Sequence, residues 1–172
     1  WWNVAPGAPV PGALLLGNGR YRVVITAAGS GFSSWGAGMD ITRWRADTTL
    51  DDWGTWIYLQ DLDTGHLWSA THQPVPGPPE QQTVRFTGHL AEFNRQENGI
   101  SVRTEVSVPP DADVELRLLT LTNHGEEPRH LALTSYAEPV LGAQDADRRH
   151  PAFNKMFIIS DYHDDDDALL LS

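Results

Sequence analysis

Hydrophobic and polar residues alternate with a period of two along much of this chain, which is the pattern of β-strands buried on one face. The clearest example is GISVRTEVSV at 99–108, whose even-numbered residues are apolar or threonine and whose odd-numbered residues after the glycine are polar. Runs rich in β-branched and aromatic residues predict further strands at 20–27, 55–61, 113–123 and 129–141. Since no 11-residue window shows helical periodicity, we expect an almost purely β fold.

Short turns containing glycine or proline separate these predicted strands. The dipeptides Asn18-Gly19 and Asn98-Gly99 are typical of type I′ hairpin turns, in which both central residues have positive φ. The prolines of PVPGPP at 74–79 cannot continue a β-ladder, so this segment should be an exposed connection. No repeat of fixed period indicates a propeller or solenoid. The sequence therefore predicts a single all-β domain over 1–172, an antiparallel sandwich or barrel.

Charge and composition exclude several classes of partner. The net charge of −11 argues against nucleic acid, because phosphates attract basic surfaces. No apolar stretch of about 18 residues occurs, so no transmembrane segment is expected in this chain. The lack of cysteine excludes disulfides and thiol chemistry and is compatible with a cytoplasmic location. The opening WWNVAPGAPVPG has neither methionine nor the features of a signal peptide, so we expect a piece of a longer protein.

Motifs for catalysis, metals and cofactors are not found. The seven histidines form no HExxH motif, and no serine lies in a G-x-S-x-G elbow. The run HDDDD at 163–167 carries oxygen ligands suited to calcium, but its spacing is that of a solvated loop. Spacing alone does not exclude a Ser-His-Asp triad, but we predict no metal and no cofactor in this chain.

The stretch GSGFSSWGAGMDITRWRAD at 29–47 is the strongest candidate for a functional surface. Its glycines allow close approach of another group, and its tryptophans and arginines suit a polar ring-shaped ligand such as a sugar, although a tight corner between strands would have the same composition. If 42–47 is a strand, alternation places the arginines and Asp47 on one face and Trp44 and Ala46 on the buried one. The candidate substrate-binding or interface residues are Ser33, Ser34, Trp35, Arg43, Arg45 and Asp47.

Five tryptophans fall between positions 35 and 68, beside several arginines and aspartates. Tryptophans in a sandwich usually pack in the core, which we expect of Trp56 and Trp68. An exposed cluster would instead stack on the C–H faces of a sugar. Composition alone leaves both interpretations of the cluster open.

Several long stretches resemble a known family. These are NGRYRVVITAAGSGFSSW, ITRWRADTTLDDWGTWIYLQDLDTGHLWSA, LTLTNHGEEPRHLALTSYAEPVL and HPAFNKMF. They are similar to the N-terminal domain of the phosphorylases of glycoside hydrolase family 94, formerly glycosyltransferase family 36. The likeness is strongest to the phosphorylase-like region of cyclic β-1,2-glucan synthases and runs from about Leu14 to Phe157.

The resemblance implies a galactose-mutarotase-like antiparallel β-supersandwich. It also implies that the catalytic acid, a carboxylate, lies in a following (α/α)₆ barrel, which is absent from this chain. In such enzymes the acid protonates the leaving oxygen while phosphate attacks the anomeric carbon from the other face. The chain alone is therefore expected to be inactive.

The resemblance further implies partners. A β-glucan or oligosaccharide and phosphate would be bound through the parent enzyme, and the domain would contact its own catalytic barrel. The resemblance also allows a homodimer and a parent attached to the inner membrane. Loops of the sandwich would lie over the active site, where Arg43 or Arg45 could contact sugar or phosphate. Alternatively, these charges form ion pairs that hold the sandwich to the barrel.

Three functions follow from these observations. The first is a noncatalytic, carbohydrate-associated domain that helps to form the substrate site and the subunit contacts of a phosphorylase or glucan synthase. The second is an autonomous carbohydrate-binding module, which needs an exposed aromatic platform. The third is a mutarotase-like enzyme, which needs a histidine and a glutamate that converge in a cleft.

Overall fold

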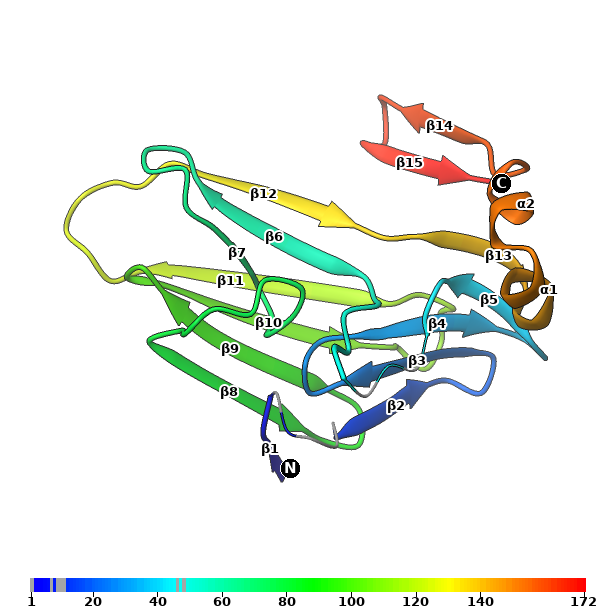
Figure 1. Ribbon diagram of the computed structural model, residues 1–172, viewed down its shortest axis with the longest axis horizontal. Coiled ribbons are helices and arrows are strands. Elements are labelled where there is room, and N and C mark those ends of the chain that lie inside the picture. Colours follow the sequence, from blue (N-terminus) through cyan, green and yellow to red (C-terminus); the bar gives the residue numbers. More distant parts are fainter. Residues whose placement is uncertain (1, 7, 9–11, 46, 48) are drawn as a thin grey trace.

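The computed structural model describes residues 2–6, 8, 12–45, 47 and 49–172. Over these residues the fold is all-β, as predicted, and every strand pair is antiparallel. The strands form two five-stranded sheets, a three-stranded sheet and a separate hairpin near the C-terminus (Figure 1).

The green strands of Figure 1 belong to the first sheet, which also includes the N-terminal strand. In spatial order its strands are β1 (Trp2–Val4), β8 (Gln81–Phe86), β9 (Ala91–Glu97), β10 (Ile100–Ser107) and β11 (Leu116–Asn123). Strand β10 confirms the predicted alternation, because Ile100, Val102, Thr104 and Val106 are all buried. The intervening side chains lie on the outer face of the sheet and are more accessible.

The second sheet covers one end of the inner face of the first sheet. Its strands are β13 (Pro139–Ala143), β5 (Met39–Thr42), β4 (Gly31–Trp35), β3 (Tyr21–Thr26) and β2 (Ala13–Gly17). Between the two sheets, Leu16 and Ile25 belong to the same buried cluster as Phe86, Phe93 and Val106. Alternating apolar residues on both sheets thus form one core.

The third sheet covers the other end of the same inner face. It consists of β12 (Leu131–Tyr136), β6 (Trp56–Asp61) and β7 (Leu67–Ser69). Here Leu59 and Trp68 pack against Ile100 and Val102 of β10. The predicted core positions of Trp56 and Trp68 are confirmed, since both side chains are buried. The first half of β10 therefore packs against the third sheet, and its last part packs against the second sheet.

The two predicted Asn-Gly turns both join hairpins, but only one has the predicted geometry. Asn98 and Gly99 have φ values of 53° and 73°, as a type I′ turn requires. In the other turn Gly19 has a positive φ and Asn18 does not. The side chain of Asn18 instead accepts backbone hydrogen bonds from Arg20 and Tyr21 at 3.0 and 2.8 Å. The type I′ prediction is wrong there because this side chain closes the turn.

The segment 129–141, predicted as one strand, is divided between two sheets. Strand β12 ends at Tyr136 and pairs with β6, whereas β13 begins at Pro139 and pairs with β5. Proline has no backbone N–H to continue a ladder and is tolerated as the first residue of a strand. The chain therefore crosses from the third sheet to the second at 137–138.

Two short helices follow β13, and they leave the fold almost purely β, as predicted. They are α1 (Gln144–Arg149) and α2 (Pro151–Lys155). Acidic residues in the first turn of α1 and basic ones in its last turn suit the helix dipole. These helices have six and five residues, which is too few for a helical hydrophobic pattern to predict them from the sequence. The chain ends in the hairpin of β14 (Ser160–His163) and β15 (Ala168–Leu171), whose turn carries the acidic run, exposed as expected of a solvated loop.

Gly31 begins β4, and its packing yields a stability prediction. Its φ is 148°, and a Cβ atom there would lie 1.9 Å from the carbonyl oxygen of Val24. We expect Gly31→Ala to lower the free energy of unfolding by about 2–4 kcal/mol, measured by urea denaturation. Gly88→Ala is the matched control, because nothing lies within 4 Å of a Cβ atom there. Equal urea midpoints for the two variants would contradict this account of Gly31.

Asp61, fully buried at the end of β6, makes stability depend on pH. Its hydrogen bond from Arg129, together with backbone hydrogen bonds from Asp63 and Thr64, lowers its pKa to about 2. Because the ordinary pKa of aspartate is about 3.9, the ionised form stabilises the fold above that pH and this stabilisation is lost as pH falls toward 2. Asp61→Asn should therefore be less stable than the wild type near pH 6 and approach it near pH 2.5, as measured by urea midpoints. A constant difference across this range would contradict the prediction.

Candidate functional site

The glycine-rich segment 29–38 is not a single loop. Gly31 begins strand β4, which pairs with β3 within the second sheet. Ser33 and Ser34 belong to this strand and are only 2% and 8% exposed. The backbone N–H of Ser33 donates to Thr42 Oγ1 at 2.9 Å. These two serines are therefore held inside the second sheet, with little side-chain surface exposed.

Trp35 lies at the end of the β4–β5 pair away from Arg43. Its side chain is exposed, and its indole N–H donates to Asp113 Oδ2 at 2.8 Å. This contact ties the β4–β5 turn to the connection before β11. Trp35 thus adjoins Ser34 within β4 and lies at the opposite end of the β4–β5 pair from Arg43.

Residues 42–47 do not form the alternating strand that the sequence predicted. Strand β5 stops at Thr42, and Arg43 is only 5% exposed instead of facing solvent. Arg45 is exposed and Asp47 is half-buried, so the predicted common face of the three charged residues is wrong. Ala46, on which the opposite face also depended, lies outside the described residues.

Trp44 is half-buried, although alternation predicted that it would be largely buried. Its ring stacks on Phe32 with the centroids 5.4 Å apart. Its indole N–H donates to Ser30 Oγ at 2.7 Å, so the ring packs beside the β3–β4 turn. Trp44 therefore links the segment after β5 to the β3–β4 turn.

Arg45 lies beside a second tryptophan that follows it in the chain. Its guanidinium sits over the ring of Trp53, 5.1 Å from the centroid, which is a cation–π contact. Asp47 has a local role, because its Oδ1 accepts backbone hydrogen bonds from Thr49 and Leu50 at 2.8 and 3.2 Å. This arrangement shapes the turn that leads from Arg45 to Trp53.

Arg43 is the centre of a buried ion-pair network. Its Nε donates to Asp147 Oδ2 at 2.9 Å, and one Nη donates to the other oxygen of the same carboxylate. Its Nη1 donates to Glu138 Oε2 at 2.8 Å, and its backbone N–H donates to the carbonyl of Glu138 at the same distance. Lys155 and Tyr136 also bond this glutamate, at 2.9 and 3.0 Å. The network therefore joins β5, β12, α1 and α2.

These contacts hold both carboxylates ionised. The hydrogen bonds from Arg43 lower the pKa of Asp147. Burial opposes ionisation of Glu138, but hydrogen bonds from Lys155, Tyr136 and Arg43 outweigh it and lower its pKa. The bond to Asp147 in turn raises the pKa of the Arg43 guanidinium. The network is thus fixed in its charged form.

A cleft of about 280 Å³ opens beside this network. Aromatic rings line much of it, and both signs of charge are present. Its lining residues are Arg43, Asp52, Trp53, Gly54, Trp56, Tyr58, Pro74, Tyr136 and Glu138. Strands β6 and β12 supply the rings of Trp56 and Tyr136, which are paired across the ladder. The cleft therefore lies over the pairing of these two strands.

Aromatic faces together with charged hydrogen-bonding groups suit a sugar ring. The ring faces of Trp53 and Tyr136 can pack against apolar C–H groups, while Asp52 and Glu138 can accept hydrogen bonds from hydroxyls. The cleft thus offers both apolar faces and hydrogen-bonding groups.

The sequence alone identified only some of the residues at this cleft. It identified Arg43 and the tryptophan cluster, and the structure brings Arg43 and the Arg45–Trp53 pair to the same place. Tyr136 and Glu138 were missed as site residues, although they lie in the family-like stretch TSYAEPV. Asp147 had no local signal, because its partner is 104 residues away in the chain.

The described residues contain no group of three or more histidine, aspartate or glutamate side chains placed to hold a metal ion. His66 and Glu97 are in contact at 2.9 Å, but Glu97 is also bound by the buried Arg95 at 2.6 Å, and neither residue lines the cleft. Among the described helices, none has the length and apolar character needed to cross a membrane.

Comparison with known proteins identifies the chain's relatives. It is 41% identical over 159 residues to a cyclic beta-(1,2)-glucan synthase, NdvB, of Rhizobium meliloti (strain 1021), a match covering 92% of this chain and 6% of the relative. It is 28% identical over 137 residues to an N,N'-diacetylchitobiose phosphorylase of Vibrio proteolyticus, covering 77% of this chain and 17% of that enzyme. A 3-O-beta-D-glucopyranosyl-beta-D-glucuronide phosphorylase of Paenibacillus borealis is 30% identical over 129 residues, 74% of this chain and 16% of the enzyme.

The chain spans less than a fifth of the length of these relatives. The model of the glycosyl hydrolase 94 supersandwich domain matches residues 2–172, nearly the whole chain. The antiparallel sheets described above agree with that match. This chain therefore belongs to the glycosyl hydrolase 94 supersandwich domain family.

Proposed function

We propose that this chain is a noncatalytic, carbohydrate-associated domain of a β-glucan phosphorylase or cyclic β-1,2-glucan synthase. Its aromatic cleft would form part of the substrate site or of the interface that shapes it. One observation carries the proposal: rings of Trp53 and Tyr136 border a cleft whose Glu138 is bonded by the buried Arg43. Relatives named as a cyclic beta-(1,2)-glucan synthase, an N,N'-diacetylchitobiose phosphorylase and a 3-O-beta-D-glucopyranosyl-beta-D-glucuronide phosphorylase support it.

The electrostatics of the cleft support a noncatalytic role. A general acid for glycosidic cleavage needs a raised pKa so that it holds a proton at neutral pH. The pKa of Glu138, in the cleft wall, is lowered, and so is that of the adjacent Asp147. Burial raises the pKa of Asp40, but this residue does not line the cleft. The acid of the parent enzyme would then belong to its helical barrel, where inorganic phosphate would attack the anomeric carbon.

Exposed apolar side chains near the C-terminus support contact with a further part of the parent. They gather on α2 and the β14–β15 hairpin and comprise Phe153, Met156, Phe157, Ile159, Tyr162, Leu169 and Leu170. Large apolar areas of this kind usually lie at interfaces. We propose that the parent's own catalytic barrel covers them. A homodimer remains a prediction.

A second candidate is an autonomous carbohydrate-binding module. It is favoured by the accessible ring of Tyr136, 45% exposed at the edge of the cleft. In that case the isolated chain would bind a β-glucan with the affinity of the intact parent. The two proposals therefore differ in whether the cleft works without the barrel.

The function of the cleft is tested by Arg45→Ala in the intact parent enzyme. The Arg45 guanidinium contacts the Trp53 ring from an exposed position. We therefore expect kcat/KM for phosphorolysis to fall about two- to fivefold. The melting temperature should not change. Arg149→Ala is the control, since this arginine is also exposed and bonds Asp145 on α1. Wild-type turnover in Arg45→Ala would refute a functional cleft, and loss of both turnover and stability would indicate a docking role.

The structural role of Arg43 is tested separately. Arg43→Met leaves Asp147 and Glu138 without their buried partner, so we expect a loss of about 3–5 kcal/mol in unfolding free energy. Arg149→Met breaks an exposed pair and should cost about 0–1 kcal/mol. Thermal and urea unfolding of both variants give the comparison. Similar small losses would mean that Arg43 does not hold the cleft together.

A further inference from the structure

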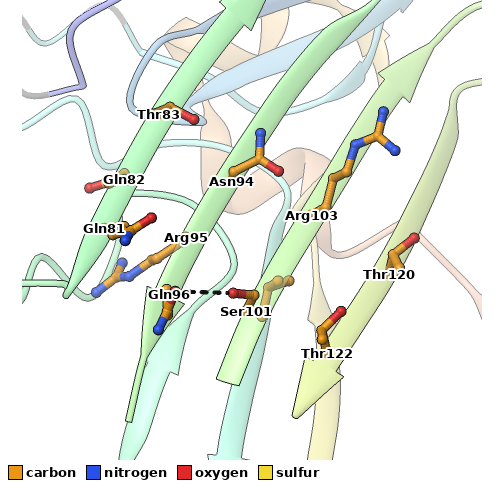
Figure 2. A pocket seen from close by; sticks show the side chains of 11 residues that line it. Gln81, Gln82, Thr83, Asn94, Arg95, Gln96, Ser101, Arg103, Thr120 and Thr122 are labelled. Carbon is orange, nitrogen blue, oxygen red and sulfur yellow. Dashed lines mark hydrogen bonds between the residues drawn. The ribbon is translucent and has the colours of Figure 1, made fainter. Parts of the chain in front are cut away.

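The outer face of the first sheet carries a second hollow, separate from the aromatic cleft. It has a volume of about 320 Å³ and lies across strands β8 to β11. Figure 2 shows Asn94, Arg103, Thr120 and Thr122 standing on neighbouring strands at this face. Its size is at the lower end of the range of small-molecule sites.

Strand register arranges the polar side chains of this face in two rows. One row crosses the sheet as Gln81, Gln96, Ser101 and Thr122, and the next crosses it as Thr83, Asn94, Arg103 and Thr120. Each row has a hydrogen-bonding side chain on every one of the four strands. Within a row, neighbouring side chains lie roughly 5 Å apart from strand to strand, and the two rows lie about 7 Å apart along the strands. The face is therefore a regular array of donors and acceptors.

Several of these groups are available to a ligand. Within the described part of the chain, the side chains of Gln81, Thr83, Thr120 and Thr122 make no hydrogen bond. Asn94 uses its amide N–H to reach Glu92 at 2.9 Å, which leaves its carbonyl oxygen as an acceptor. The face therefore offers both donors and acceptors, as sugar hydroxyls require.

The charge of the face selects against anions. Arg103 donates to Glu92 at 2.7 Å and to Glu105 at 2.8 Å, and Arg85 also pairs with Glu92 at 3.8 Å, so two carboxylates balance two arginines. Its Nη1 makes no hydrogen bond within the described residues and can still donate to a neutral hydroxyl. A phosphate or sulfate would meet no surplus positive charge here.

An apolar strip borders the array on β11. Leu116 and Leu118 point to the same outer face as Thr120 and are 51% and 61% exposed. Sugar rings are amphipathic, with C–H groups between hydroxyls, and aliphatic side chains can cover the C–H groups. The exposed leucines can therefore contact the C–H groups of a pyranose, while the polar array beside them bonds its hydroxyls.

We propose that this outer sheet face binds a neutral oligosaccharide, with the hydroxyls on Asn94, Arg103, Thr120 and Thr122 and the C–H groups on the two leucines. The choice of glucose units rests on the proposed function, whereas the hydrogen-bonding argument does not. The face would hold a glucan chain at a distance from the chemistry and raise its local concentration. Binding here requires no catalytic residue.

The test uses the intact protein that contains this chain, labelled at leucine methyl groups. Titration with a neutral β-1,2-linked gluco-oligosaccharide should shift the methyl resonances of Leu116 and Leu118. In the double variant Thr120→Val and Thr122→Val, which keeps side-chain shape, the affinity measured from these shifts should fall about tenfold. Thr134→Val on β12 is the matched control, because it is an exposed strand threonine outside the hollow.

Three results would overturn the proposal. They are unshifted leucine resonances, equal affinity in the double variant, and stronger binding of an anionic polysaccharide than of the neutral one. A fall in phosphorolysis of a short substrate in the double variant would also overturn it, because the face would then belong to the catalytic site. If Arg45→Ala leaves turnover unchanged while the leucine shifts persist, the proposed function fails and the glycan-binding face stands.

Discussion

The pairing of Arg43 with Asp147 and Glu138 joins segments of the chain that the strand ladders alone would leave loosely connected. Asp147 lies 104 residues after Arg43, on a helix of six residues that is too short to be stable by itself. A buried guanidinium requires partners, since an unpaired charge in the interior is costly. The same requirement places Glu138 in the cleft wall, with Tyr136 beside it on the preceding strand. The geometry of the cleft is therefore a consequence of satisfying one buried cation.

The first sheet has a different constraint, because its inner face must serve two cores. Strand β10 packs against the third sheet at Ile100 and Val102 and against the second sheet at Val106. Arg95 lies on the inner face of the neighbouring strand and donates to the backbone carbonyls of Thr71 and Val75. This holds the proline-containing connection against the sheet. With the inner face fully used, the polar outer face is free to vary without cost to the core, which is where a binding surface can arise.

The sequence predicted the sheets better than the site, and the reason is the range of the interactions. Alternation in β10 and the Asn98-Gly99 turn depend on neighbours in the chain, and both were confirmed. The exposure of Arg43 was predicted wrongly because alternation was extended past Thr42, where β5 ends. Nothing near Arg43 in the sequence shows that α1 brings a carboxylate to it. The outer-face array likewise depends on strand register, which becomes visible only when β8 to β11 are placed side by side.

The two surfaces differ in a way that suits different parts of one ligand. The cleft beside Arg43 combines aromatic rings with fixed charges of both signs, so it can orient a single sugar strongly and discriminate between orientations. The outer face of the first sheet has regularly spaced polar groups, a charge-paired arginine and two aliphatic side chains, so neighbouring positions along it all offer hydrogen bonds. A polymer of identical sugars can shift along such an array at little cost, because each lost hydrogen bond is replaced by an equivalent one. Orienting one sugar requires contacts that differ from position to position, whereas holding a polymer that can shift requires contacts that repeat. Two separate surfaces on one sandwich can meet both requirements.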